Sequence, residues 1–166
     1  MPVAMPAVVE RTVTLERTPL AALEHVPLLA GLTPQQLRRV ATVARLKRFA
    51  AGTAMVRLGD PGNAFYVILE GRALVVRERR RPLQLEAGDF FGELALIEDA
   101  PRSADVIAAD DVLALTIGRA AFTRLLRSEA ALTYVMLRTL VGRLRADQRS
   151  TVWQLGNLTA PGATRG

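Results

Sequence analysis

Residues 1–24 show no sustained hydrophobic period, and we expect a tail or one short helix there. The first clear helical pattern follows Thr33, because a capping side chain followed by Pro34 is a favoured helix start. Behind this start, apolar residues recur at helical spacing at Leu37, Val40, Ala41 and Ala44. The pattern therefore predicts an amphipathic helix of about three turns.

From Arg45 onward the pattern changes to short apolar runs broken by glycine and proline turns. The runs read KRFA, TAMVRL, AFYVILEG, RALVVRER and PLQLEAG, and later SADVIAAD and DVLALTI. Closely spaced short strands of this kind are typical of a barrel or jelly roll. One predicted hairpin tip is crowded by Arg77, Arg79, Arg80 and Arg81. We favour a charged turn that discourages edge pairing over a nucleic-acid contact at this tip.

Two helical patterns end the chain. The first, RAAFTRLLRS, is short, and the second covers about residues 129–155. The longer pattern has a seam along or near one face, made by Leu132, Met136, Leu140, Leu144, Thr151 and Leu155. Such a seam is long enough to pair with a twin helix, the alternative being packing on its own barrel. The last residues, 159–166, read as a flexible tail.

Composition limits the chemistry that the chain can carry. The net charge is +6, and the absence of cysteine excludes disulfides, iron–sulfur clusters and thiolate catalysis. His25 is the only histidine, which excludes a metal site built from clustered imidazoles. No apolar run has the length of a membrane span, and the N-terminal residues do not read as a signal peptide. We therefore expect a cytoplasmic protein with no membrane partner.

The stretch from Phe91 to Ala104 gathers groups that suit an anionic ligand. Gly92 allows the backbone to approach a ligand closely, and Glu93 begins a short helical turn whose unpaired N–H groups suit an anion. Arg102 adds a guanidinium fork that matches phosphate oxygens, and Ser103 adds a hydroxyl. One stretch thus offers a nest for an anion, a fork for a phosphate and a carboxylate for a sugar hydroxyl.

This stretch resembles the phosphate-binding cassette of the cyclic nucleotide-binding domain family. The family pattern is Phe-Gly-Glu-Leu-Ala-Leu, a short loop, then Pro-Arg, a small residue and Ala, and it matches Phe91, Gly92, Glu93, Leu94, Ala95, Leu96, Pro101, Arg102, Ser103 and Ala104. The order of GDPG, YVILEG and GDFFGEL fits as well. The resemblance implies an α+β, mainly β fold, a double-stranded β-helix (jelly-roll) barrel flanked by an N-terminal helix and two C-terminal helices. It puts the cyclic nucleotide-binding domain at residues 25–158.

The resemblance also implies a role for individual cassette residues. In the family, the glutamate holds the ribose 2′-hydroxyl and the arginine holds the cyclic phosphate, and these roles fall on Glu93 and Arg102. The ligand is also expected to meet Gly92, Ala95 and Ala104 of the same cassette.

The rest of the pocket comes from outside the cassette or from its edge. Val75, Leu85 and Leu94 should line the nucleotide side, by family correspondence and by strand position. For the base contact, counting forward from the cassette leads to Asp147, and counting back from the end of the long helix leads to Thr151. The two differ by about one helical turn, and both stay open.

The residue after the cassette arginine bears on the ligand. It is Ser103, and serine occurs there in bacterial cAMP receptors, so we expect a bacterial protein that binds cAMP, with cGMP as the alternative. Cyclic nucleotide would reposition the C-terminal helix, which lids the nucleotide and often dimerises in the family. The expected partners are therefore a second copy of the chain and a protein effector of unknown identity, and we expect neither enzymatic activity nor a metal.

Other readings remain. A degenerate domain kept for dimerisation or protein contact is one, although it would have no need of both Glu93 and Arg102. A sensor fragment of a larger regulator is another, because too few residues follow Leu158 for a DNA-binding domain in this chain. An enzyme on a cupin-like barrel would need histidine and carboxylate metal ligands, which one histidine does not supply.

Overall fold

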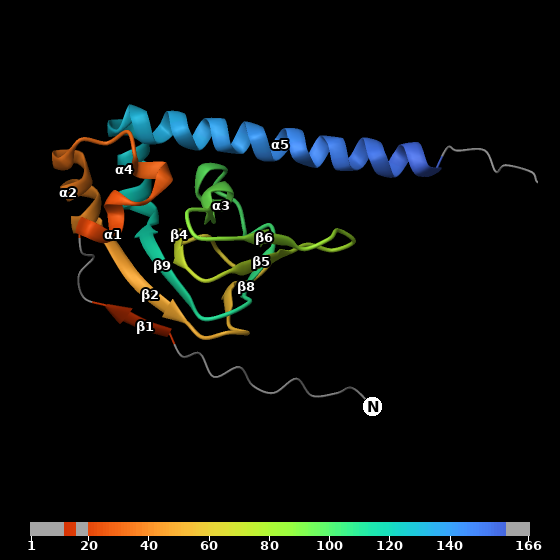
Figure 1. Ribbon diagram of the computed structural model, residues 1–166, viewed down its shortest axis with the longest axis horizontal. Helices are drawn as coiled ribbons and strands as arrows, with labels where there is room; N and C mark the ends of the chain where they lie inside the picture. Colours follow the sequence, from red (N-terminus) through yellow and green to blue (C-terminus); the bar gives the residue numbers. More distant parts are fainter. Residues whose placement is uncertain (1–11, 16–19, 159–166) are drawn as a thin grey trace, which may run out of the picture.

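The computed structural model describes residues 12–15 and 20–158, with side chains for residues 20–149. Two antiparallel sheets form the barrel, one in the order β1-β2-β9-β4-β7 and the other in the order β3-β8-β5-β6 (Figure 1). The strands are β1 (Thr12–Leu15), β2 (Ala44–Phe49), β3 (Ala54–Val56), β4 (Ala64–Glu70), β5 (Ala73–Val76), β6 (Leu83–Leu85), β7 (Phe90–Phe91), β8 (Asp105–Ala108) and β9 (Val112–Gly118). The α+β, mainly β jelly roll predicted from the sequence is confirmed.

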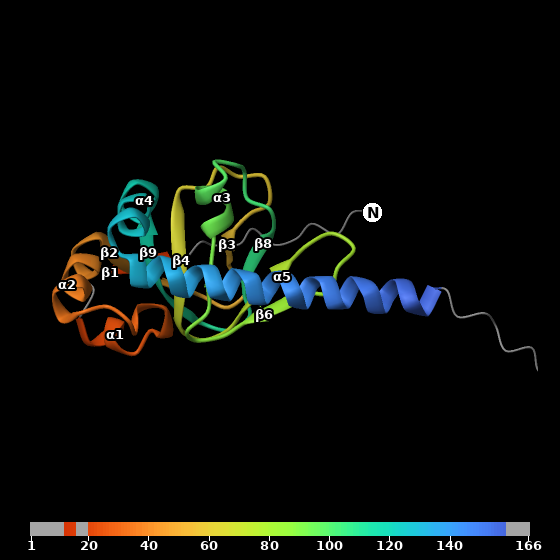
Figure 2. The ribbon, with the colours of Figure 1, turned by 90° about the horizontal axis from the view of Figure 1, so that it is seen from above.

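Helices gather at one end of the barrel and along one side of it. They are α1 (Leu20–Glu24), the 3-10 helix η1 (Pro27–Leu29), α2 (Pro34–Val43), α3 (Glu93–Ile97), α4 (Arg119–Ser128) and α5 (Ala130–Leu158). α5 crosses the barrel above α3 and continues past the hairpin that joins β5 and β6 (Figures 1 and 2). The long last helix therefore lies over the segment that carries the cassette.

The central strands β4 and β9 pair along most of their length and are buried on both faces. Alternate side chains of a strand point to opposite faces, so β4 serves two cores at once. Phe65 and Val67 pack with the helices, while Tyr66 and Ile68 pack inside the barrel. Burial on both faces explains why this strand reads as a continuous apolar run rather than an alternating one.

Two strands were not predicted from the sequence. Residues Thr12–Leu15, which we expected to be a tail or part of a short helix, form β1 at the sheet edge. Phe90–Phe91 form the two-residue strand β7 beside β4. Both are too short to be identified by periodicity alone, and each is stabilised by pairing with a strand distant in the sequence, β2 for β1 and β4 for β7. Of the expected N-terminal helix, Leu20–Glu24 is present as α1.

The seam predicted on α5 holds only for its first half. Leu132 and Met136 are buried, and Leu140 packs partly against the same core. Leu144, however, is 59% exposed, and the ridge facing the barrel continues instead through Arg143 and Asp147. An α-helix has 3.6 residues per turn, so a strict spacing of four drifts away from the barrel. The side chains of Thr151 and Leu155 lie outside the described residues.

A buried carboxylate fixes the point where α5 begins. Glu129 separates α4 from α5, and its side chain is 1% exposed. It accepts hydrogen bonds from Arg39 Nη2 at 2.8 Å and from the Gln36 side chain, both on α2. The hydrogen bond from Arg39 is the main reason why the pKa of Glu129 lies below its usual value. The clamp joins the N-terminal helices to the start of α5.

We expect Glu129→Gln to lower the free energy of unfolding by about 1 kcal/mol at neutral pH, because Arg39 is half exposed and solvent screens part of the pair. A carboxylate with a lowered folded pKa stabilises above its unfolded pKa of about 4.3, and this is lost as pH falls through the folded value. Urea denaturation should therefore give a gap between parent and variant that closes below about pH 4. Glu24→Gln, at an exposed carboxylate of α1, is the control. A gap that does not change with pH would contradict the clamp.

Candidate functional site

The cassette begins with a sharp turn at Gly92, between β7 and α3. Gly92 has φ +86°, in the left-handed region that favours glycine, and it is the N-cap of α3. A Cβ at this position would lie 2.7 Å from Arg102 Nη1 and 3.0 Å from the Ala64 carbonyl oxygen. Glycine is therefore required twice, by the backbone angle and by the close approach of the arginine.

Arg102 is buried with its charge. Its side chain donates from Nη1 to the Gly92 carbonyl at 3.0 Å and from Nη2 to the Ala64 carbonyl at 2.8 Å. The residue is 4% exposed, and within the described part of the chain no carboxylate forms an ion pair with it. Burial lowers the pKa of its guanidinium, which is the expected response of a cation removed from water. The positive charge of Arg102 is therefore hydrogen-bonded by two neutral carbonyl groups and is not neutralised by them.

The loop that carries Arg102 is held from the other side by backbone pairing. The Arg102 amide donates to the Asp60 carbonyl at 2.8 Å, and the Gly59 amide donates to the Arg102 carbonyl at 2.9 Å. Pro61 and Pro101 form an isolated antiparallel bridge beside them. The guanidinium is therefore delivered by a fixed backbone and not by a loose loop.

Glu93 lies on the first turn of α3 and is 4% exposed. Burial raises the pKa of its carboxyl, opposed by its own backbone N–H and by the charges of Arg143 and Arg102. A carboxylate next to two cations can accept a hydrogen bond from a hydroxyl donor. The expected pair, Glu93 and Arg102, is thus brought into one charged cluster with Gly92.

Arg143 of α5 completes this cluster, and it was not predicted from the sequence. Its Nη2 donates to the Phe90 carbonyl at 2.7 Å, and its Nη1 lies 3.5 Å from Glu93 Oε1. Its guanidinium carbon lies over the Phe90 ring, 4.4 Å from the centroid. The spacing in the sequence could have indicated it: Arg143 follows the buried Met136 by seven residues, or about two helical turns, and so lies on nearly the same face of the helix.

Asp147 is held by the β5–β6 hairpin. Arg80 Nη1 contacts both carboxylate oxygens of Asp147, at 2.6 and 2.7 Å. The hydrogen bond from Arg80 is the main reason why the pKa of Asp147 lies below its usual value. Arg80 therefore does more than charge a turn, since it ties the hairpin tip to α5. The side chain of Thr151, the other candidate for a base contact, lies outside the described residues.

The remaining expected site residues divide by exposure. Leu85 is buried inside the barrel, and Val75 packs against the same core from the neighbouring strand. Ala95 and Ala104 are buried and Ser103 is exposed. Leu94 is 43% exposed and belongs to neither core cluster, so the structure does not bring it together with Val75 and Leu85.

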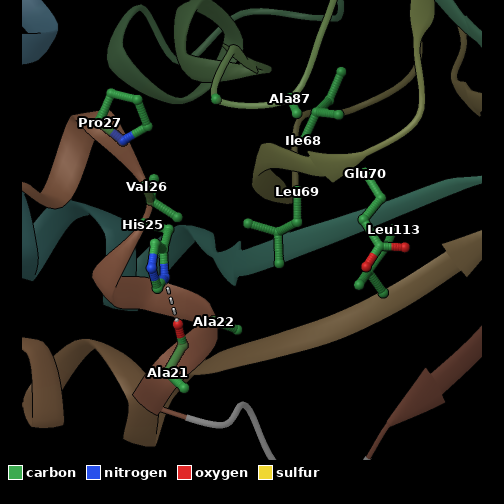
Figure 3. Close-up of a pocket in the computed structure, with 11 residues that line it drawn as sticks. Ala21, Ala22, His25, Val26, Pro27, Ile68, Leu69, Glu70, Ala87 and Leu113 are labelled. Carbon is green, nitrogen blue, oxygen red and sulfur yellow. Dashed lines mark hydrogen bonds between the residues drawn. The ribbon is translucent and has the colours of Figure 1, made fainter.

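A separate cavity of about 290 Å³ lies where α1 and η1 meet the ends of β4 and β9 (Figure 3). Its lining is mostly apolar, and its titratable groups are His25 and Glu70. His25 Nδ1 donates to the Ala21 carbonyl at 3.2 Å. None of Gly92, Glu93 and Arg102 lines this cavity, which makes it distinct from the cassette.

Within residues 12–15 and 20–158, no group of three or more histidine, aspartate and glutamate side chains could hold a metal ion. No helix in the same residues is long and apolar enough to cross a membrane.

Comparison with known proteins gives one family. A family model described as the cyclic nucleotide-binding domain matches residues 46–129. The cAMP-dependent protein kinase regulatory subunit of Hypocrea atroviridis is 44% identical over 104 residues, which cover 63% of this chain and 22% of that protein. The regulatory subunit of Mucor circinelloides f. lusitanicus is 38% identical over 125 residues, covering 73% of this chain and 29% of that protein. The chain spans less than a third of either relative.

Solved structures agree with this match. The regulatory domain of Toxoplasma gondii protein kinase A, crystallised with cAMP, gives a TM-score of 0.63 at 31% identity, covering 72% of this chain and 48% of that one. The catabolite activator protein of Thermus thermophilus gives 0.68 at 27% identity, covering 77% and 63%. The expectation of a bacterial protein is contradicted, because the curated relatives are fungal kinase regulatory subunits, including that of Neurospora crassa. The motif alone misled here, because similar domains occur both in fungal kinase regulatory subunits and in the catabolite activator protein of Thermus thermophilus.

We expect Gly92→Ala to destabilise the protein more than Gly52→Ala. Both residues have positive φ, +86° and +82°, so both substitutions carry the same backbone strain of about 1 kcal/mol. Only at Gly92 does the new Cβ meet the Arg102 guanidinium and a carbonyl, which adds about 1–3 kcal/mol, whereas at Gly52 nothing lies within 4 Å. Urea denaturation of the two variants measures the difference. Equal losses would mean that the approach of Arg102 to Gly92 is not a constraint.

Proposed function

The chain belongs to the cyclic nucleotide-binding domain family, and we propose that it is a receptor module for a cyclic nucleotide, with cAMP as the first candidate and no catalysis of its own. The observation that carries the proposal is the Arg102 guanidinium, buried beside the Gly92 turn without a carboxylate ion partner in the described residues. A buried cation of this kind is costly unless an anion meets it. A cyclic phosphate supplies one negative charge and oxygens that match the fork.

The carboxylate of Glu93 is the proposed partner of the ribose 2′-hydroxyl. Burial raises the pKa of Glu93, and the charges of Arg143 and Arg102 oppose this shift and favour the accepting carboxylate form. A ribose and a phosphate are joined in a cyclic nucleotide, so one ligand would engage Glu93 and Arg102 together. The inward-facing Val75 and Leu85 would supply apolar surface for the remainder of the ligand. We propose residues 25–158 as the module.

The ligands of similar proteins support cAMP without deciding which base the chain binds. The fungal relatives are named as cAMP-dependent kinase regulatory subunits, and a Mycobacterium smegmatis neighbour, at 32% identity and a TM-score of 0.65 over 76% of this chain and 41% of that one, is a cAMP-binding acyltransferase. A neighbour from Trypanosoma cruzi is described as cAMP-independent and bound to guanosine. Binding experiments therefore need cAMP, cGMP and the nucleosides side by side.

Arg102→Ala should weaken cAMP binding by about 10- to 100-fold, because a hydrogen bond to a charged group contributes about 1.5–3 kcal/mol. Arg102→Lys should restore only part of the affinity, since a point charge replaces the fork. Isothermal titration calorimetry measures both, and Arg72→Ala, at an exposed arginine paired with Asp110, is the matched control. Unchanged affinity in Arg102→Ala would refute the proposal.

We also propose that the ligand acts on α5. Two ion pairs join this helix to the ligand-side elements, Arg143 with Glu93 and Asp147 with Arg80. A ribose hydroxyl bound to Glu93 would compete with Arg143 for the same carboxylate and so weaken the Arg143–Glu93 contact that holds α5. The ligand can shift α5 only by the difference in its affinity for the two arrangements.

Hydrogen exchange should then change in α5 as well as in the cassette when cAMP is added, most strongly around Arg143. Arg143→Met should remove most of the change in α5, because the side chain that links the helix to Glu93 is gone. Arg138→Met, at an exposed arginine on another face of α5, should keep it. A change confined to residues 91–104 in the parent would leave a binder without a switch.

The outward face of α5 is the proposed output surface. Tyr134, Leu137, Val141 and Leu144 are exposed at alternating spacings of three and four residues, which is the seam of a coiled coil. This repeat fits the same helix of a second copy of the chain. Analytical ultracentrifugation should then give a larger mass for the parent than for a Leu137→Glu variant. An effector protein, a kinase subunit by analogy with the names of the fungal relatives, is the other occupant.

A further inference from the structure

Three aromatic rings lie together inside the barrel, and one of them belongs to Phe91, the first residue of the cassette. Tyr66 of β4 stacks in parallel on Phe91 of β7, with ring centroids 4.8 Å apart and an interplanar angle of 1°. Phe49 of β2 meets the Tyr66 ring edge-on at 6.4 Å. The register of the sheet fixes this stack, because Tyr66 and Phe91 are directly paired across β4 and β7. Tyr66 is 6% exposed, so its ring is held on several sides.

The Arg102 guanidinium lies over the face of this ring, with its carbon 5.8 Å from the Tyr66 centroid. The cation also touches the Gly92 and Ala64 carbonyls, so the ring is its aromatic neighbour on the barrel side. A cation over an aromatic face is attracted to the ring quadrupole, and the attraction grows when water is excluded. Arg102 is a desolvated cation of this kind.

We propose that the ring of Tyr66 is a positioning residue for Arg102, holding the guanidinium in the orientation in which it meets a phosphate. This rests on the proposed function, since it deepens the account of the same site. The ring is stiff because it is stacked on Phe91, and a stiff support keeps the fork from turning toward the barrel interior. An aliphatic side chain would fill the space without attracting the cation.

The hydroxyl of Tyr66 takes no part in this support. Burial raises the pKa of Tyr66, so the phenol stays neutral and forms no phenolate pair with Arg102. In the described residues, no hydrogen bond joins its hydroxyl to another group. The aromatic face alone therefore carries the effect, and phenylalanine should replace tyrosine.

The test is a double-mutant cycle on cAMP affinity, measured by calorimetry. Tyr66→Phe should bind as the parent does, and Tyr66→Leu should bind about five- to tenfold more weakly. In the Arg102→Ala background, Tyr66→Leu should change affinity by less than about twofold, because the cation that the ring supports is absent. Phe49→Leu is the matched control: it removes a ring from the same cluster, without a contact to Arg102, and should have the same effect in both backgrounds.

Each outcome decides something. Tyr66→Phe as weak as Tyr66→Leu would overturn the proposal by pointing to the hydroxyl. Equal effects of Tyr66→Leu with and without Arg102 would overturn it by showing a merely structural ring. If Tyr66→Leu does not fold, replacing Tyr66 by pentafluorophenylalanine keeps the shape of the ring and reverses its charge pattern, and the same loss of affinity is expected. A parent that binds no cyclic nucleotide would refute the proposed function itself, which is a distinct result.

Discussion

The charge of Arg102 is the constraint around which the cassette is built. A guanidinium removed from water is costly unless its donors and its charge are met. Gly92 has to lack a Cβ so that Arg102 Nη1 can approach and donate a hydrogen bond to the Gly92 carbonyl. The backbone of the loop at Asp60 pairs with the Arg102 backbone and so fixes where the side chain starts. The turn, the loop and the aromatic stack under the cation are thus consequences of one buried charge. In the proposed function, the same charge favours an anionic ligand, because an anion offsets the cost of burying the cation.

A single sheet separates the Tyr66–Arg102 contact inside the barrel from the core that packs against α4. Tyr66 faces Arg102 inside the barrel, while its neighbour Phe65 faces outward and stacks on Phe122 of α4 at 4.7 Å. A central strand buried on both faces is close-packed and has little room to move. The coupling that we propose between ligand and helices would therefore run around the sheet, along the rim where α5 crosses α3 and the β5–β6 hairpin. Among the side chains of α5 up to residue 149, Arg143 and Asp147 form ion pairs at this rim.

Features that depend on neighbouring residues could be predicted from the sequence, and features that depend on contacts between distant residues could not. The Gly92–Arg102 motif is contiguous, and the start of α2 at Thr33 is a local capping box, so both could be predicted from neighbouring residues. β1 and β7 pair with strands far away in the chain, and runs of four and two residues are too short to identify a strand on their own. Arg143 lies 50 residues from Glu93, and Asp147 lies 67 from Arg80. A single charged residue is interpreted as solvent-exposed until its partner is known. For this reason the hairpin arginines were interpreted as a charged turn, although Arg80 pairs with Asp147 of α5.

The two halves of α5 are held by forces of different strength, and this decides where the helix can yield. Near its start, Leu132 and Met136 are buried, and Glu129 is clamped to α2. Each buried apolar side chain contributes about 1.5–3 kcal/mol, which a single ligand contact does not easily offset. Among the described side chains, those that attach the helix past Leu140 include Arg143, whose contact with the buried Glu93 is long at 3.5 Å, and Asp147, which pairs with Arg80. The Arg80–Asp147 pair is half exposed, and exposed ion pairs contribute only about 0–1 kcal/mol. In the proposed switch, a ligand that alters the surroundings of Glu93 acts on the more weakly held part, so we expect the helix to bend or swing from its buried first turns rather than move as a whole.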